Sequence, residues 1–370
     1  MNRRGLLAAV GTGLASGLAG CGYAHGAGEV VDEKRIRSVS RRTKAYVTTD
    51  ERILHVNSPS VFDDGDRSLY LVDRQGIQRQ QDTYGAPTEA VALDPSATTA
   101  YLLAASTGRP DEEEATGVAT VDLTADEANH PYTRIDGIIS GEDVPDRSPR
   151  FGGGGALAAT DAGAYCLLED GVAAVREEGE RWRRDLDAPA TVAADEHVVV
   201  ATEGGVRAFD EDGAERWHVG TTEPPAVAIA GDRTAVHADD ELRLVDTDGE
   251  TEWTTELPSG STQLRFDDDW LLVEWRNSVA VVDTDDGTLR LDRSRRISTP
   301  AVWDGDRAYS VRDCGLVAVD ADGELWQRPF DLDGCRAIDG WIDGDHVVIL
   351  FTSGDLLWFS RTEEEPGLLW

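Results

Sequence analysis

One stretch of sequence decides the fold: Ala208-Phe209-Asp210-Glu211-Asp212-Gly213-Ala214-Glu215-Arg216-Trp217. Similar stretches follow at Leu244 to Trp253, around Val282-Asp283 with Gly287, and at Ala318 to Trp326. The aspartates that share one place in these copies are Asp210, Asp246, Asp283 and Asp320, which are 36, 37 and 37 residues apart. A period of this length indicates a repeat architecture, with one four-stranded blade in each repeat.

Inside a repeat, short apolar runs alternate with turns. Residues 225 to 259 contain the turns Gly231-Asp232, Asp239-Asp240 and Asp248-Gly249, and this spacing is typical of β-hairpins. The aspartate before each Asp-Gly turn is expected to cap the turn by accepting hydrogen bonds from backbone N–H groups. One tryptophan per repeat falls in the outermost strand, and a place between blades is favoured over a ligand-binding aromatic set. These residues are Trp182, Trp217, Trp253 and Trp326.

The repeat resembles the pyrroloquinoline-quinone-type (PQQ-like) propeller repeat, whose pattern is Ala-x-Asp-x-x-Thr-Gly-x-x-x-Trp. The sequence keeps the Ala, Asp, Gly and Trp phases but lacks the Thr, and it is often one residue shorter. The resemblance covers residues from about 36 to 361, strongly after 160 and weakly before. The resemblance implies an all-β propeller. That family includes quinone-dependent dehydrogenases and also exported lipoproteins that assist outer-membrane barrel assembly, so it does not decide the activity.

Counting the repeats predicts an eight-bladed β-propeller of four-stranded antiparallel blades. The expected blade starts are Lys44, Thr88, Arg150, Ala190, Ala226, Thr262, Thr299 and Arg336. The last unit ends near Arg361 without a fourth strand, and Arg35 to Arg41 is a spare strand-like piece. The ring is therefore expected to close with an N-terminal strand. Seven blades, with the first unit as irregular decoration, is the alternative.

The N-terminus predicts export. Residues 1–21 contain Arg3-Arg4 and an apolar run that is too short to span a bilayer, and they end at Cys21. They resemble a twin-arginine signal with the lipobox Leu18-Ala19-Gly20-Cys21, which implies a lipid on Cys21 and an anchor on the outer face of the cytoplasmic membrane. A plain signal peptide is the alternative. Residues 22–35 are expected to be a flexible tether, 36–361 the propeller and 362–370 a C-terminal tail.

The charge of the chain excludes one class of partner. There are 71 acidic and 35 basic residues, a formal charge of -36, and the only lysines are Lys34 and Lys44. Nucleic acid is excluded as a partner, because binding phosphates needs a positive field. Acidic, lysine-poor chains resemble the proteins of salt-accumulating archaea, in which molar salt screens self-repulsion. An ordinary acidic protein is the alternative.

No motif predicts chemistry. The seven histidines have unrelated phases, and Gly152 to Gly155 is not followed by Lys-Ser/Thr, so we expect neither a metal site nor a phosphate loop. Segments such as Asp246 to Gly249 resemble half a calcium loop but lack the later glutamate, which favours turn capping. No catalytic residue and no cofactor are predicted.

Two cysteines and three insertions are the candidate sites. Cys314 and Cys335 are expected on one face of the propeller, where they either form a disulfide or stay unpaired. Insertions at Asn57 to Asp66, Ser106 to Thr116 and Gly137 to Gly155 lie at junctions that share a face. Either they are solvated loops or they bind a partner through the candidate residues Arg109, Arg147, Arg150 and Phe151.

The sequence therefore predicts a non-enzymatic, monomeric cell-surface lipoprotein that binds a protein or an envelope component and meets the membrane only through its lipid. The alternatives are a quinone-dependent oxidoreductase, for which no adjacent cysteine pair is present, and a purely structural envelope component.

Overall fold

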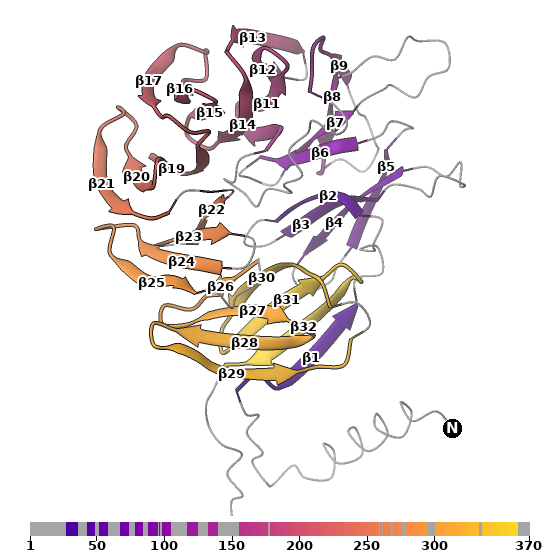
Figure 1. Ribbon diagram of the computed structural model, residues 1–370. Coiled ribbons are helices and arrows are strands. Elements are labelled where there is room, and N and C mark those ends of the chain that lie inside the picture. Colours follow the sequence, from indigo (N-terminus) through magenta and orange to yellow (C-terminus); the bar gives the residue numbers. More distant parts are fainter. Residues whose placement is uncertain are drawn as a thin grey trace, which may run out of the picture.

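The computed structural model (Figure 1) describes most of the chain between residues 27 and 361. The described residues are 27–35, 43–48, 52–57, 67–73, 78–83, 88–94, 96, 98–104, 117–124, 132–139, 155–176, 178–258, 260, 262–267, 269–275, 278–294, 300–332 and 335–361. Over these ranges, no helix has the length and apolar character that a membrane crossing requires.

The described strands form eight four-stranded antiparallel sheets arranged as blades of a ring (Figure 1). Blade 1 is β2 (Thr43–Thr48), β3 (Arg52–Asn57), β4 (Arg67–Asp73) and β5 (Gln78–Thr83); blade 2 is β6 (Thr88–Leu93), β7 (Thr99–Ala104), β8 (Gly117–Asp122) and β9 (Tyr132–Arg134); blade 3 is β10 (Leu157–Thr160), β11 (Gly163–Leu168), β12 (Gly171–Arg176) and β13 (Gly179–Asp185); blade 4 is β14 (Pro189–Ala194), β15 (Val198–Thr202), β16 (Gly205–Phe209) and β17 (Glu215–Gly220). Blade 5 is β18 (Ala226–Ala230), β19 (Arg233–Ala238), β20 (Glu241–Val245) and β21 (Thr251–Glu256); blade 6 is β22 (Thr262–Asp267), β23 (Trp270–Trp275), β24 (Ser278–Asp283) and β25 (Leu289–Ser294); blade 7 is β26 (Val302–Trp303), β27 (Ala308–Arg312), β28 (Gly315–Asp320) and β29 (Gly323–Pro329); blade 8 is β30 (Ala337–Asp343), β31 (His346–Phe351), β32 (Asp355–Ser360) and β1 (Val30–Arg35).

The predicted eight-bladed architecture is confirmed, and the first unit is a full sheet. The predicted starts at Thr88, Ala226 and Thr262 coincide with the first residues of β6, β18 and β22. The prediction is furthest off at blade 3, where β10 starts at Leu157 and not at Arg150. The reason is that the long connection before this blade disturbs the repeat period.

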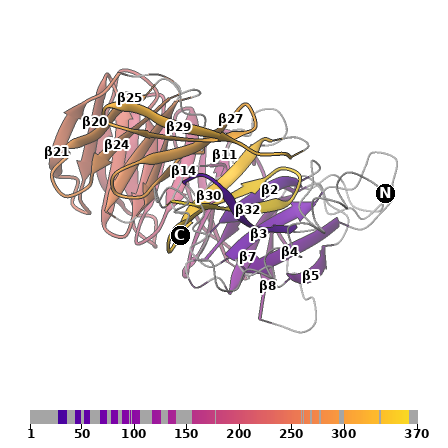
Figure 2. The same ribbon diagram turned by 90° about the horizontal axis from the view of Figure 1, so that it is seen from below.

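The ring closes with an N-terminal strand, as predicted, but the strand lies earlier in the chain. β1 pairs antiparallel with β32, from Val30 opposite Phe359 to Arg35 opposite Asp355, and the indigo β1 runs close to the yellow β32 in both views (Figures 1 and 2). Residues 30–35 are therefore a strand and not a tether. The sequence favours a tether here because these residues lack an apolar period. An outermost strand can form without a regular apolar period, and Val31 is the one apolar residue of β1 that packs on the core of blade 8.

The aspartates of the repeat cap their turns. Asp210 Oδ1 accepts the N–H groups of Asp212 (3.0 Å) and Ala214 (2.8 Å), and Asp246 Oδ1 accepts those of Asp248 and Glu250 (both 2.9 Å). The glycine that ends the turn has a positive φ, +77° at Gly213, which is the backbone conformation that favours glycine. The Asp-x-Asp-Gly pattern is thus a turn signal, and its Oδ1 atoms are used within the fold.

The repeated tryptophans join neighbouring blades. Trp182, on β13, covers Gly213 of the next blade so closely that a Cβ there would lie 2.6 Å from the indole. Trp217 covers Gly249 and Trp253 covers Gly287 in the same way. The indole Nε1 of Trp182 also donates to the Glu211 carbonyl (2.8 Å). The outer strands β13, β17 and β21 are therefore each held to the next blade by an indole that needs a glycine opposite it.

Candidate functional site

The antiparallel strands divide the connections between two faces. We call turn face the side with the turns between first and second and between third and fourth strands, such as Asp195 to His197 and Asp210 to Gly213. We call loop face the opposite side, with the turns between second and third strands and the connections between blades. The predicted partner residues Arg109, Arg147, Arg150 and Phe151 lie outside the described residues, as does Cys21.

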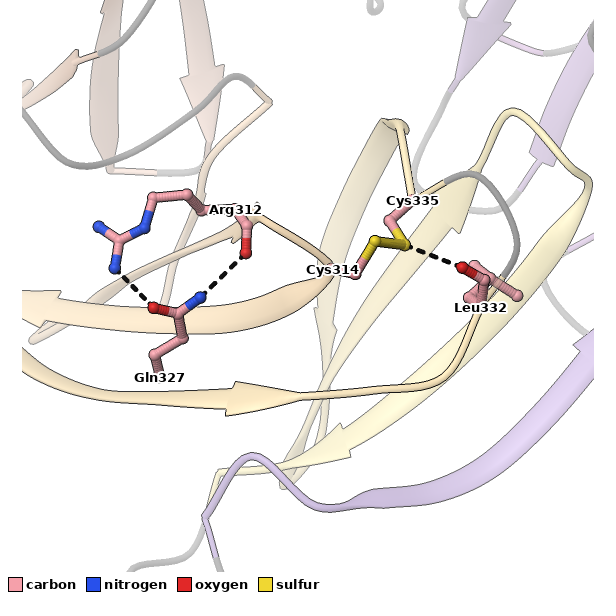
Figure 3. The surroundings of a disulfide bond; sticks show 5 residues. All are labelled: Arg312, Cys314, Gln327, Leu332 and Cys335. Atoms are coloured by element: carbon pink, nitrogen blue, oxygen red, sulfur yellow. Dashed lines mark hydrogen bonds between the residues drawn. A yellow bond between two sulfur atoms is a disulfide. The ribbon is translucent and has the colours of Figure 1, made fainter.

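The structure joins Cys314 and Cys335 in a disulfide on the loop face (Figure 3). The S–S distance is 2.00 Å and the Cα atoms are 5.1 Å apart. Cys314 lies in the turn between β27 and β28 with a φ of +54°, and Cys335 lies in the connection from blade 7 to blade 8. Cys335 Sγ is 3.0 Å from the Leu332 carbonyl oxygen, which is a close contact because a disulfide sulfur has no proton to donate. The bond ties the last blade to the rest of the ring.

The surroundings brace this turn further. The Arg312 guanidinium donates to Gln327 Oε1 (2.8 Å), and Gln327 Nε2 donates to the Arg312 carbonyl (3.1 Å; Figure 3). The N–H of Phe330 donates to the Cys314 carbonyl (3.0 Å), and the Phe330 ring packs on Phe351 and Phe359 of blade 8. The disulfide thus lies beside an aromatic contact between the two blades, and the two reinforce each other.

Blade 8 closes through a turn that is split between the two ends of the described chain. In blade 4, Gly213 N donates to the Asp210 carbonyl (3.0 Å) and Asp210 N to the Ala214 carbonyl (3.0 Å). In blade 8, Gly28 N donates to the Ser360 carbonyl (2.7 Å) and Ser360 N to the Glu29 carbonyl (3.0 Å).

The split turn also receives its tryptophan. A Cβ on Gly28 would lie 2.5 Å from Trp326 Cζ3 and from Arg328 Cγ, so Trp326 of blade 7 covers Gly28 as Trp182 covers Gly213. The Arg328 Nε donates to the Ala27 carbonyl (3.2 Å), and in blade 3 the Arg184 Nε donates to the Gly213 carbonyl (2.6 Å). Sequence reasoning missed Gly28 and Arg328. A signal was present, since Gly28-Glu29 repeats the order of Gly249-Glu250 and Gly323-Glu324.

A buried ion pair links blades 6 and 7. Arg265 and Glu274 have side chains that are 7% and 5% exposed, and Arg265 Nη2 lies 3.6 Å from Glu274 Oε1. Glu274 Oε1 accepts the Ala301 N–H (2.9 Å), and the Arg265 guanidinium donates to the Ala301 carbonyl. The Arg265–Glu274 ion pair therefore hydrogen-bonds both the N–H and the carbonyl of Ala301, the residue before β26.

Two buried histidines serve the core. His197 Nε2 lies 3.0 Å from Thr234 Oγ1, and desolvation lowers the pKa of His197 to about 4. His237 contacts Thr262 Oγ1 (3.0 Å) and the Leu257 carbonyl (3.2 Å), and burial lowers its pKa as well. Both rings are neutral at pH 7 and connect neighbouring blades. Within the described ranges no group of three or more His, Cys, Asp or Glu side chains is arranged to hold a metal ion.

The repeat matches a known family over part of the chain. Residues 141–242 match the family model described as outer membrane protein assembly factor BamB (PQQ_2). The crystal structure of BamB from Moraxella catarrhalis is similar, with a TM-score of 0.58 and 11% identity over 90% of this chain and 99% of that chain. Virginiamycin B lyase from Staphylococcus aureus has a TM-score of 0.47 and 9% identity over 89% of this chain and 98% of that chain. No curated protein sequence matches.

These comparisons establish a PQQ-like repeat and the propeller fold. At 11% identity the likeness to BamB concerns the fold alone, and the family match covers a part of the chain that includes blades 3 and 4. The activity must therefore be argued from the residues themselves.

Proposed function

We propose that the protein is a non-enzymatic, lipid-anchored scaffold of the cell envelope, which uses its propeller to bind a protein partner. One observation carries the proposal: the repeated polar residues of the ring are used by the ring itself. Turn aspartates accept backbone N–H groups, the Arg265–Glu274 pair holds Ala301, and the two buried histidines contact threonines. Such a rigid closed ring suits the presentation of surface loops better than chemistry.

The loop face is the proposed binding surface. The three insertions of the sequence, in blades 1 and 2 and before blade 3, interrupt the strands at junctions of this face. Arg147, Arg150 and Phe151 fall in the last insertion and Arg109 in the second one, and arginine with an aromatic residue is typical of interface anchors. The family model that matches residues 141–242 takes its description from an assembly factor, which agrees with a scaffold role.

Cross-linking in intact membranes tests the binding surface. Arg150→Ala with Phe151→Ala should abolish the capture of the partner that the unaltered protein captures, at molar salt. The control is Arg216→Ala with Leu325→Ala, an exposed arginine and an exposed apolar residue on outer strands of blades 4 and 7. Equal capture by both double variants would place the binding surface elsewhere. A visible absorbance band in the pure protein would instead favour the quinone-dependent oxidoreductase.

The anchor has its own test. Cys21→Ala should release the protein from membranes or leave it as an uncleaved precursor, because the proposed lipid is carried by the Cys21 sulfur. Membrane retention that is unchanged in this variant would contradict the anchor without touching the scaffold role. The salt dependence of stability is a separate expectation. Because the formal charge is -36, the thermal midpoint of unfolding should rise between low and molar salt, as screening weakens the repulsion between like charges.

A further inference from the structure

We propose that the rim of blades 7 and 8 on the turn face is the edge of the propeller that lies against the lipid bilayer. The proposal rests on the lipid anchor at Cys21 and adds an orientation to it. The occupant of this edge is the surface of the membrane that holds the lipid.

The chain is fixed to the ring from Ala27 onward. Ala27 is only 7% exposed, and Arg328 Nε holds its carbonyl at 3.2 Å. Gly28 is buried under Trp326 and bonded to Ser360 at 2.7 Å. Ala27 therefore cannot move away from the rim unless the split turn opens, and the leash between lipid and ring ends there.

The leash is short compared with the ring. Six residue steps separate Cys21 from Ala27, and a fully extended chain covers about 20 Å in that distance. A compact domain of this size is about 50 Å across. The rim at Ala27 must therefore stay near the headgroups, and the rim across the ring, at blade 4, cannot replace it.

The split turn of blade 8 carries less negative charge than the turns between the third and fourth strands of blades 4, 5 and 7. The turns of blades 4 and 5 bring Asp210, Glu211 and Asp212, and Asp246 and Asp248. The split turn of blade 8 brings Arg361 and Glu29, and Arg328 lies exposed beside it. The anchor point itself therefore repels anionic headgroups less than the other turns between third and fourth strands do, while Asp320 and Asp322 of blade 7 and Asp343 and Asp345 of blade 8 lie farther along the same rim.

The orientation leaves the loop face available. β1 starts at the turn face with Val30 and ends at Arg35, opposite Asp355, which follows the loop-face turn of blade 8. The Cys314–Cys335 disulfide lies on that loop face as well. The side proposed to bind a partner therefore points away from the anchor point.

Energy transfer to the membrane tests the orientation. The lipidated full chain is bound to phosphatidylglycerol vesicles that contain an acceptor-labelled lipid, and a donor is attached at Asp322→Cys or Asp212→Cys. Both sites are exposed turn-face residues, in blades 7 and 4 respectively. We expect transfer at least twofold more efficient from residue 322. Equal or reversed efficiencies in vesicle-bound protein would overturn the orientation while leaving the anchor intact.

Two further measurements separate the possible failures. Mass spectrometry of the N-terminal peptide reports the lipid on Cys21, and its absence together with lost vesicle binding would overturn the anchor and the orientation together. Insertion of a twenty-residue Gly-Ser segment between Gly26 and Ala27 should make the two transfer efficiencies converge. A difference that persists with the long segment would contradict the short leash as its cause.

Discussion

Blades 4 and 8 hold their outermost strands with the same contacts but with different chain connections. In blade 4, β16 and β17 are joined by the turn from Asp210 to Gly213, whereas in blade 8 the equivalent residues Ser360 and Gly28 are not consecutive in the chain. The hydrogen bonds, the covering tryptophan and the arginine that reaches the glycine region recur in both. In these two blades the glycine and the indole that covers it recur with and without a continuous chain, so this contact does not require chain continuity.

Removal of the closing strand should have the largest effect. Deletion of residues 27–35 exposes the edge of β32 and leaves Trp326 uncovered, so we expect a loss of at least 5 kcal/mol, roughly, or no folded protein. Thermal unfolding followed by circular dichroism measures it. Deletion of residues 22–26 alone is the control and should leave the midpoint unchanged, and equal midpoints for both deletions would contradict the role of β1.

Substitution of the covered glycine compares the two kinds of turn directly. Gly28→Ala and Gly249→Ala each place a Cβ 2.5 Å from a tryptophan side-chain atom at positive φ, so each should cost about 2–4 kcal/mol. The control is Gly344→Ala, where φ is +55° but no atom lies within 4 Å, and where only the strain of about 1 kcal/mol applies. Denaturant unfolding measures all three. A Gly28 variant that behaves like the Gly344 variant would show that the split turn is looser than the continuous one.

Loss of the disulfide tests whether the last blade needs an added link. The N–H of Leu257 donates to the Asp240 carbonyl (3.0 Å) after blade 5, as Phe330 does to Cys314 after blade 7, but only the second junction is also held by a disulfide. Cys314→Ser with Cys335→Ser should cost about 3 kcal/mol for a separation of 21 residues. Midpoints in denaturant, with and without reductant, measure it. Reductant should lower the denaturant midpoint of the unaltered protein and leave that of the variant unchanged. If reductant does not change the midpoint of the unaltered protein, the disulfide does not stabilise the last blade.

Low pH should reduce the free energy of unfolding through His197, which connects blades 4 and 5. The pKa of His197 is about 4 when folded and 6.5 when unfolded, so the unfolded chain binds the proton more readily. The stability that the neutral ring provides is present above pH 6.5 and is lost as the pH falls toward 4, by about 3 kcal/mol in total. His197→Gln should flatten this decline in unfolding curves between pH 7 and 4. His237, whose pKa is also lowered, contributes to the part that remains. If the free energy of unfolding fell equally with pH in the unaltered protein and in the His197→Gln variant, this assignment would be contradicted.

The repeat period predicted the blades because each Asp-Gly turn and each tryptophan has a fixed local role. The 36- and 37-residue spacing of Asp210, Asp246, Asp283 and Asp320 places β16, β20, β24 and β28 in equivalent positions. The closing strand was placed too late because residues 30–35 are mostly exposed and carry no periodic signal. Only the two residues Gly28-Glu29 carry the repeat there.

The candidate sites were predictable to different degrees. The topology predicts that Cys314 and Cys335 share one face, which left a disulfide and two unpaired cysteines open, and the structure has the disulfide. The Arg265–Glu274 pair could not be predicted, since an arginine and a glutamate nine residues apart are common, and only the packing of blade 6 against Ala301 makes them meet. The partner residues in the insertions have no repeat to constrain them, so they stay a prediction.

Because Val30 pairs with Phe359, the ring can close only after the chain has been synthesised through its last strand, β32. During synthesis β1 has no partner until the last strand has left the ribosome, and a chain that stops before Asp355 leaves β1 unpaired and Gly28, which Trp326 covers, without its hydrogen bond to Ser360. Such a product exposes a strand edge that the complete molecule covers. If the chain is exported in the folded state, as the resemblance to a twin-arginine signal implies, this exposed strand edge would distinguish an interrupted translation product from the complete protein.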